Sequence, residues 1–100
     1  MILVSGKVCF RQADLERVRP AMAAMVNASL AEDGCIDYAY SIDVLDPTIM
    51  RIIERWRDRA ALAAHFQTPH MAQWLAVLAD LDISDRELFM MDGDQLEFGL

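Results

Sequence analysis

The spacing of hydrophobic residues changes several times along this chain, and the order of those spacings limits the folds open to it. Residues 2–10 place alternate side chains on two faces and predict a strand. From Asp14 to Leu30, hydrophobic residues recur at three- and four-residue steps, as an amphipathic helix requires. Pro20 lies early in this helix, so we expect it to kink the helix or to separate an initial turn. Gly34 follows this helix and is a residue that commonly ends one, so we expect the helix to end there.

The middle of the chain predicts a β-hairpin. Residues 35–44 alternate again, and the Leu-Asp-Pro-Thr sequence at 45–48 predicts a turn, because proline fixes one backbone dihedral. Residues 49–56 predict the returning strand, so the two strands should pair as neighbours. The residues expected on one face of the first of these strands are Ile36, Tyr38, Tyr40 and Ile42.

Two helices and a final strand follow the hairpin. Asp58 is a good N-cap for a short helix, and Thr68 with Pro69 begins a second one, because proline at the first helical position gives up no needed hydrogen bond. Residues 86–91 predict the last strand, and residues 95–100 could pair as a further edge strand. The residues that these helices should bury are Leu62, Phe66, Met71, Trp74, Leu75, Leu78 and Leu81.

This order of elements predicts an α+β fold in a single domain over residues 1–100, with helices covering one face of a largely antiparallel sheet. The other face of the sheet also carries hydrophobic residues, and 55% of the chain is hydrophobic. A sheet that is apolar on both faces needs a second layer, which a second copy of the chain would supply. We therefore predict a homodimer whose sheets pack face to face.

The charge of the chain argues against some partners. Its formal net charge is −7 and Lys7 is its only lysine, so nucleic acid would be repelled. Its hydrophobic runs fall short of the roughly 20 residues that span a bilayer, and residues 1–10 lack the features of a signal peptide. We expect a cytoplasmic protein that binds neither nucleic acid nor membrane. Cys9 and Cys35 should be buried free thiols.

The two histidines invite a metal-site hypothesis, which their spacing does not favour. Zinc-binding histidines on one helix usually lie four residues apart, whereas His65 and His70 are five apart with Thr68 and Pro69 between them. We therefore expect no metal site. His70 should lie near solvent at a helix start. His65 shares the inward stripe with Leu62 and is a candidate catalytic residue, the alternative being a hydrogen-bonded core histidine.

Glu54 is the second unusual residue, because alternation places it on a strand face between Ile52 and Trp56. A carboxyl group in such apolar surroundings has a raised pKa, which suits a general acid or base. The alternative is an ion pair with Arg86 or a partner chain, because the arginines next to Glu54 in sequence should lie on the opposite strand face. Tyr38 and Tyr40 are expected to point into the same space, the alternative being buried tyrosines that only pack and form hydrogen bonds.

Several short motifs together resemble the antibiotic biosynthesis monooxygenase family. They are Gly34-Cys35, Tyr38, Asp46-Pro47, Glu54 with Trp56, Ala61-Leu62 with His65, and Thr68 with His70. The resemblance covers nearly the whole chain. It implies a ferredoxin-like βαββαβ fold, two copies of which form a dimeric α+β barrel with a pocket in each subunit.

The resemblance also implies an activity, a cofactor-independent monooxygenation of a small aromatic phenol or hydroquinone by molecular oxygen. His65 or Glu54 would then be the base and Tyr38 would orient the substrate oxygen. The substrate-binding residues would be Trp56, Phe66, Trp74, Tyr40 and Gly6. Two alternatives stay open, namely a non-catalytic dimeric barrel that binds a small apolar ligand and a small-molecule isomerase of the same fold.

Haem-degrading relatives of this family use an asparagine on the first strand, a tryptophan and a haem-ligating histidine. This chain has Gly6, His65 and Leu75 at or near those places, so we expect no haem and no other cofactor. The helices also lack an obvious cluster of arginine and lysine, which argues against a phosphorylated ligand.

Overall fold

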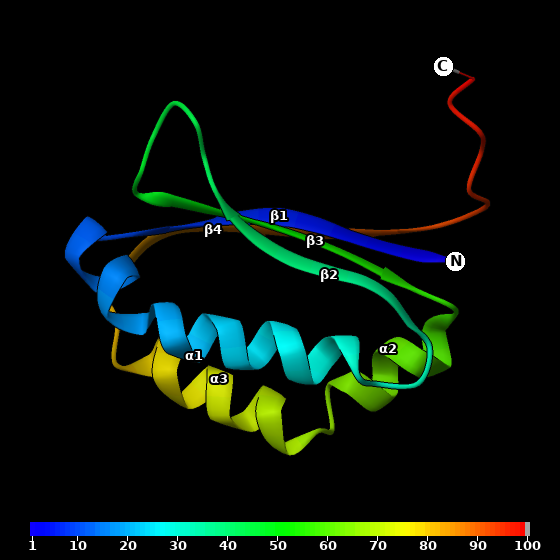
Figure 1. Cartoon of the computed structure of the whole chain (residues 1–100), viewed down its shortest axis with the longest axis horizontal. Helices are drawn as coiled ribbons and strands as arrows, with labels where there is room; N and C mark the ends of the chain where they lie inside the picture. Colours follow the sequence, from blue (N-terminus) through cyan, green and yellow to red (C-terminus); the bar gives the residue numbers. More distant parts are fainter. Residues whose placement is uncertain (100) are drawn as a thin grey trace.

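The computed structural model describes residues 1–99, which form a four-stranded antiparallel sheet covered on one face by helices (Figure 1). The strand order is β2-β3-β1-β4, so the first strand lies inside the sheet. This arrangement confirms the predicted α+β class and the ferredoxin-like order. The elements are β1 Ile2–Phe10, α1 Gln12–Leu30, β2 Cys35–Ile42, β3 Ile49–Trp56, α2 Arg59–His65, α3 Pro69–Ala79 and β4 Ile83–Asp92.

Several predicted boundaries are wrong, including the end of β2, which lies at Ile42 and not at residue 44. Helix α1 begins at Gln12 and continues through Pro20, so the proline does not separate an initial turn. Proline removes only one backbone donor, and burial of the inner face of α1 against the sheet outweighs that loss. Strand β4 is longer than residues 86–91, because its pairing with β1 extends almost along the whole of β1. Residues 95–99 form no strand, and Leu100 lies outside the described residues.

The hydrophobic core lies between the helices and one face of the sheet. A register shift between Cys35 and Asp37 removes Ile36 from the predicted inner face of β2, where it is 48% exposed, whereas Tyr38 stays buried as predicted. Helix α3 buries Trp74, whereas Leu75 is 49% exposed. The buried hydrophobic residues that the strands and α1 contribute are Ile2, Val4, Val8, Phe10, Leu15, Val18, Met22, Met25, Tyr38, Met50, Ile52 and Trp56.

Gly6 lies in the middle of β1, between Ile52 of β3 and Leu88 of β4. A side-chain carbon at this position would overlap the carbonyl oxygen of Glu87 and lie 2.9 Å from the Cα atom of Leu88. Only glycine therefore lets β4 approach β1 this closely. This steric requirement gives Gly6 a role in sheet packing.

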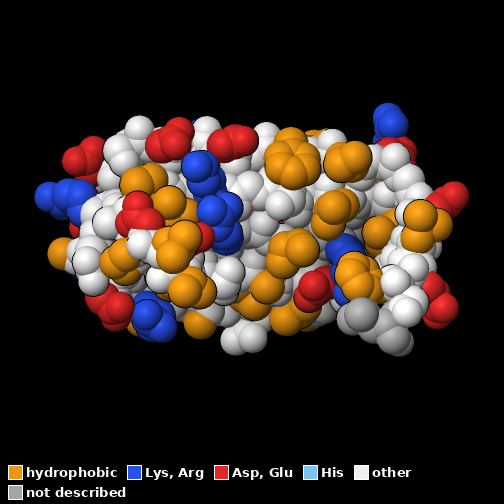
Figure 2. Space-filling model, turned by 90° about the horizontal axis from the view of Figure 1, so that it is seen from above, with side chains coloured by type: hydrophobic (Ala, Val, Ile, Leu, Met, Phe, Trp, Pro, Cys, Tyr) orange, Lys and Arg blue, Asp and Glu red, His pale blue; other side chains and the backbone are white. Residues whose placement is uncertain are grey.

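The face of the sheet that the helices leave uncovered carries many hydrophobic side chains (Figure 2). Ile53, Phe89 and Met91 are all exposed, and alternation along β3 and β4 places them on this face. The tail after β4 runs on the same side, where Gln95 accepts a hydrogen bond from Arg55 at 3.0 Å. Within residues 1–99, no helix combines the length and the hydrophobicity needed to cross a membrane.

Candidate active site

A cavity of about 350 Å³ lies between the sheet and helices α2 and α3. Most of its wall is hydrophobic, and its polar side chains include Glu54, His65 and the two tyrosines Tyr38 and Tyr40. Phe66 and Trp74 also line it, whereas Trp56 and Gly6 are not part of its wall. The remaining lining residues are Val4, Val8, Met50, Ile52, Met71, Leu75, Leu78, Arg86, Leu88, Phe89 and Met90. A concave and largely apolar space with a few convergent polar groups is typical of a small-molecule site.

Glu54 lies on β3, beside Tyr38 of β2 and Val4 of β1, and only 8% of it is exposed. Its Oε1 atom accepts a hydrogen bond from the indole Nε1 of Trp56 at 2.9 Å. Burial raises the pKa of the carboxyl group, and the hydrogen bond from Trp56 opposes part of that rise. Within the described part of the chain, Glu54 forms no ion pair with Arg86 or any other arginine.

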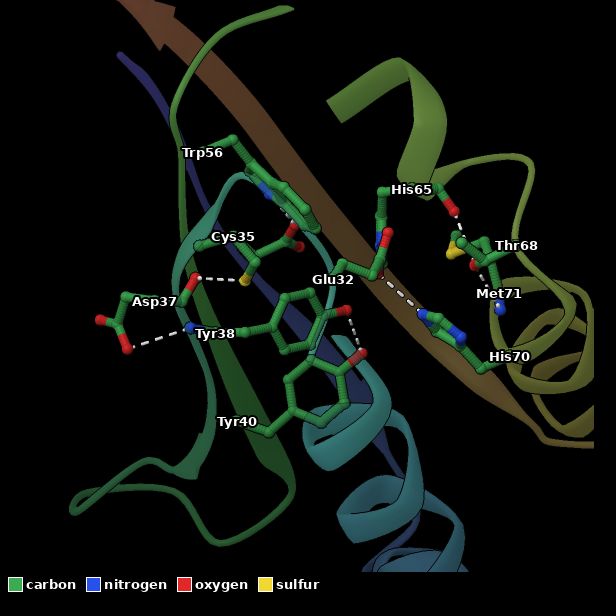
Figure 3. Close-up of polar contacts among 11 residues, drawn as sticks. Glu32, Cys35, Asp37, Tyr38, Tyr40, Trp56, His65, Thr68, His70 and Met71 are labelled. Atoms are coloured by element: carbon green, nitrogen blue, oxygen red, sulfur yellow. Dashed lines mark hydrogen bonds and ion pairs between the residues drawn. The ribbon is translucent and has the colours of Figure 1, made fainter. Parts of the chain in front are cut away.

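The hydroxyl groups of Tyr38 and Tyr40 lie 2.8 Å apart (Figure 3). Burial raises the pKa of both phenols well above the usual range, so both are protonated at neutral pH. One hydroxyl donates to the other, which leaves one O–H proton of the pair free to donate to a ligand oxygen. The pair therefore provides a neutral hydrogen-bond donor in the cavity.

The two histidines meet at one carboxylate, a convergence that their five-residue spacing did not predict. Nδ1 of His65 lies 2.6 Å and Nε2 of His70 lies 2.8 Å from the same oxygen, Oε2 of Glu32 (Figure 3). The two imidazole centroids are 5.9 Å apart. His65 is almost fully buried and stacks near Trp56, with ring centroids 4.6 Å apart. His70 keeps 21% of its side chain exposed at the start of α3, so it borders solvent as predicted.

Thr68 explains why the helix break brings the histidines together instead of separating them. Its hydroxyl donates to the carbonyl oxygen of His65 at 2.8 Å and accepts from the backbone N–H of Met71 at 3.2 Å. Thr68 therefore ends α2 and caps α3. The cap of α3 confirms the prediction from the sequence. The chain turns within residues 66–68, so the end of α2 and the start of α3 both reach Glu32.

Glu32 is a site residue that sequence reasoning missed, because it stands in a polar stretch read only as a helix end. It follows α1 and precedes β2, whose first residue, Cys35, pairs with Trp56 at the end of β3. Helix α2 begins shortly after that point. An antiparallel hairpin places the start of its first strand beside the end of its second strand. This topology could have predicted that Glu32, just before β2, lies near α2, just after β3.

Cys35 lies near these groups without being an activated nucleophile. Burial and the nearby carboxylate of Glu32 raise the pKa of its thiol to about 11. Its Sγ atom lies 3.6 Å from the carbonyl oxygen of Asp37. The thiol is therefore protonated at neutral pH, which argues against thiolate chemistry.

The strand order and the helix layer define a ferredoxin-like α+β protein with a largely hydrophobic cavity between sheet and helices. This chain belongs to the antibiotic biosynthesis monooxygenase family, whose sequence model matches residues 1–77. That membership supports a monooxygenase-like function.

Two relatives show how far the similarity extends. The chain is 31% identical over 80 residues to an uncharacterised protein of Synechocystis, covering 80% of this chain and 54% of that protein. It is 38% identical over 69 residues to the Escherichia coli protein named "Probable quinol monooxygenase YgiN", covering 61% of this chain and 62% of that protein. The chain thus spans less than two thirds of either relative.

Solved structures share the fold. A protein from Deinococcus radiodurans matches with a TM-score of 0.91 at 22% identity, covering 100% of this chain and 99% of that one. Rv0793 from Mycobacterium tuberculosis matches with a TM-score of 0.83 at 24% identity, covering 95% and 96%. At these identities the likeness concerns the fold alone.

Proposed function

We propose that this protein is a monooxygenase that oxidises a small aromatic phenol or hydroquinone with molecular oxygen. The observation that carries the proposal is the meeting of Glu54, His65 and the pair Tyr38–Tyr40 in one largely hydrophobic cavity. An aromatic ring fits such a wall, and its hydroxyl group needs both a proton acceptor and a hydrogen-bond donor. The name of the Escherichia coli relative agrees with a quinol substrate.

In this mechanism Glu54 accepts the proton of the substrate hydroxyl. Burial raises the pKa of Glu54, so the difference between this pKa and that of a phenol is smaller and the proton transfer is less unfavourable. The free O–H of the tyrosine pair donates to the phenolate oxygen and holds it in place. His65, fixed by Glu32, completes the polar side of the cavity.

The electron-rich phenolate then reduces oxygen itself. One oxygen atom forms a bond to a ring carbon, and the other leaves as water with the hydrogen displaced from that carbon and the phenolic proton. The ring becomes a quinone, so its oxidation supplies all the electrons that oxygen takes up. The protein binds the ring, moves a proton and excludes water from the intermediates.

Oxygen uptake tests this proposal directly. Protein treated with a chelator and freed of added cofactors should consume oxygen when given members of a panel of hydroquinones and polycyclic phenols. The product should contain one more oxygen atom, detected by mass spectrometry. Absence of uptake across the panel, together with tight binding of the same compounds, would instead support the non-catalytic binding protein.

We also propose that the protein works as a homodimer through the uncovered face of the sheet. Exposed Ile53, Phe89 and Met91 would gain burial there, and the apolar character of this face supports the pairing. Sedimentation velocity at micromolar concentration should give the mass of two chains. A monomer under these conditions contradicts the pairing. A charged residue at Ile53 (Ile53→Glu) should shift a dimer toward monomer without unfolding it, since this side chain is exposed in the single chain.

A further inference from the structure

We propose that Glu32, His65 and His70 bind one divalent transition-metal ion of the zinc type. The inference goes beyond the proposed oxidation and does not depend on it, because metal binding is measured without substrate. It rests on the convergence of three metal-ligating side chains that come from three separate segments of the chain: the turn after α1, the end of α2 and the start of α3.

The distances suit a single small ion. The three donor atoms, Nδ1 of His65, Nε2 of His70 and Oε2 of Glu32, all lie within 4.8 Å of one another. Ligands bonded to zinc at about 2.1 Å in a tetrahedron lie roughly 3.4 Å apart. The two nitrogen–oxygen distances, 2.6 and 2.8 Å, are shorter than that value. The distance between the two imidazole nitrogens has an upper limit of 4.8 Å, which is longer than that value. An ion at the centre of the cluster therefore requires adjustments of the order of an ångström.

The donor set matches a zinc site with an open coordination position. Two imidazoles and one carboxylate are three protein ligands of the kind that zinc prefers, and water would complete the tetrahedron. One nitrogen of each imidazole lies within hydrogen-bond distance of the same carboxylate oxygen. An ion would bind these two nitrogens, any proton on them would move to the other ring nitrogen or to solvent, and the charge of the ion would offset that of Glu32.

The ligands are held in position, and the cluster can be reached from outside. Thr68 fixes the turn that carries both histidines. The backbone N–H of Glu32 bonds to Ser29 at 3.0 Å, and its carbonyl accepts from Cys35 at 3.2 Å. A groove between α1 and α3 reaches His70. Since the side chains of Glu32 and His70 are 13% and 21% exposed, water and an ion can enter from that side.

Binding of Zn²⁺ and Co²⁺ to tag-free, chelator-treated protein tests the site. Calorimetry should show one Zn²⁺ per chain, and Co²⁺ should give the visible absorption of a tetrahedral ion. The thermal midpoint of unfolding should rise with Zn²⁺ concentration, because the ion joins three segments only in the folded state. Glu32→Gln and His70→Gln should each weaken binding at least about tenfold, since even residues that merely support metal ligands contribute that much.

Asp33→Asn is the matched control for Glu32→Gln. Asp33 is the adjacent carboxylate, 95% exposed and paired with Arg57, so its variant should bind Zn²⁺ like the parent. Cys35→Ser tests the nearest thiol and should likewise retain binding. The inference is overturned if the parent binds no Zn²⁺, if both Glu32→Gln and His70→Gln bind as the parent does, or if Cys35→Ser alone abolishes binding. Should Glu32→Gln fail to fold, the partly exposed His70→Gln decides the matter.

Oxygen uptake by the chelated protein separates this inference from the proposed function. Binding of Zn²⁺ without oxidation of any phenol would support the metal site and contradict the proposed function. Oxidation of phenols without binding of Zn²⁺ would support the proposed function and contradict the metal site.

Discussion

Glu54→Gln is expected to lower kcat for phenol oxidation by about 10²–10⁴-fold, the usual contribution of a general base. Glutamine keeps the size of the side chain and can still accept the hydrogen bond from Trp56, but it cannot take up the substrate proton. KM should change little, because the apolar wall that binds the ring is intact. Steady-state oxygen uptake with the fastest substrate of the panel measures both constants.

The pH profile adds a second readout for the same variant. Since the ionised form of Glu54 is the acceptor, kcat/KM of the parent should rise with pH through the raised pKa of this carboxyl and then level off. Glu54→Gln should lack that rise. Glu16→Gln alters an exposed carboxylate on α1, away from the cavity and from the uncovered sheet face, and should behave like the parent. A Glu54→Gln variant with the parental kcat would remove Glu54 from the mechanism.

Much of the fold could be predicted because burial is periodic in the sequence. Alternation along residues 49–56 gives β3 with its observed bounds, and it correctly sets Glu54 in the inner row with Ile52 and Trp56. The failures arise where one local rule competes with tertiary packing. Pro20 breaks isolated helices, yet the buried face of α1 holds the helix together around it. The irregular pairing at Cys35 depends on the neighbouring strand, which alternation alone does not reveal.

The site was predictable in part for the same reason. The positions of Glu54, Tyr38 and Tyr40 follow from strand alternation, which fixes the face of each side chain. The cluster at Glu32 depends on contacts between segments 33 and 38 residues apart in sequence. Spacing rules for metal ligands apply within one helix, so they do not reveal that His65 and His70, which lie on two helices, meet at one carboxylate.

Trp56→Ala is expected to lower the free energy of unfolding by about 3–5 kcal/mol, the range for deleting a buried aromatic side chain. Trp56 is fully buried, and its ring lies against His65 and edge-on to Tyr38, with centroids 4.6 and 6.4 Å away. Its removal leaves a cavity at the end of the sheet and an unpaired Oε1 on Glu54. Urea unfolding, monitored by the fluorescence of the remaining Trp74, should show a lower midpoint at an unchanged m-value.

Trp56→Phe separates packing from hydrogen bonding, because phenylalanine keeps an aromatic ring and lacks the indole N–H. The variant should lose less stability than Trp56→Ala. The hydrogen bond from Trp56 lowers the pKa of Glu54, so its removal should raise that pKa further, which an NMR titration of the side-chain carboxyl detects. An unchanged or lower pKa would show that the indole does not stabilise the ionised carboxylate. Because this titration needs no substrate, it tests the electrostatic setting of Glu54 independently of any reaction.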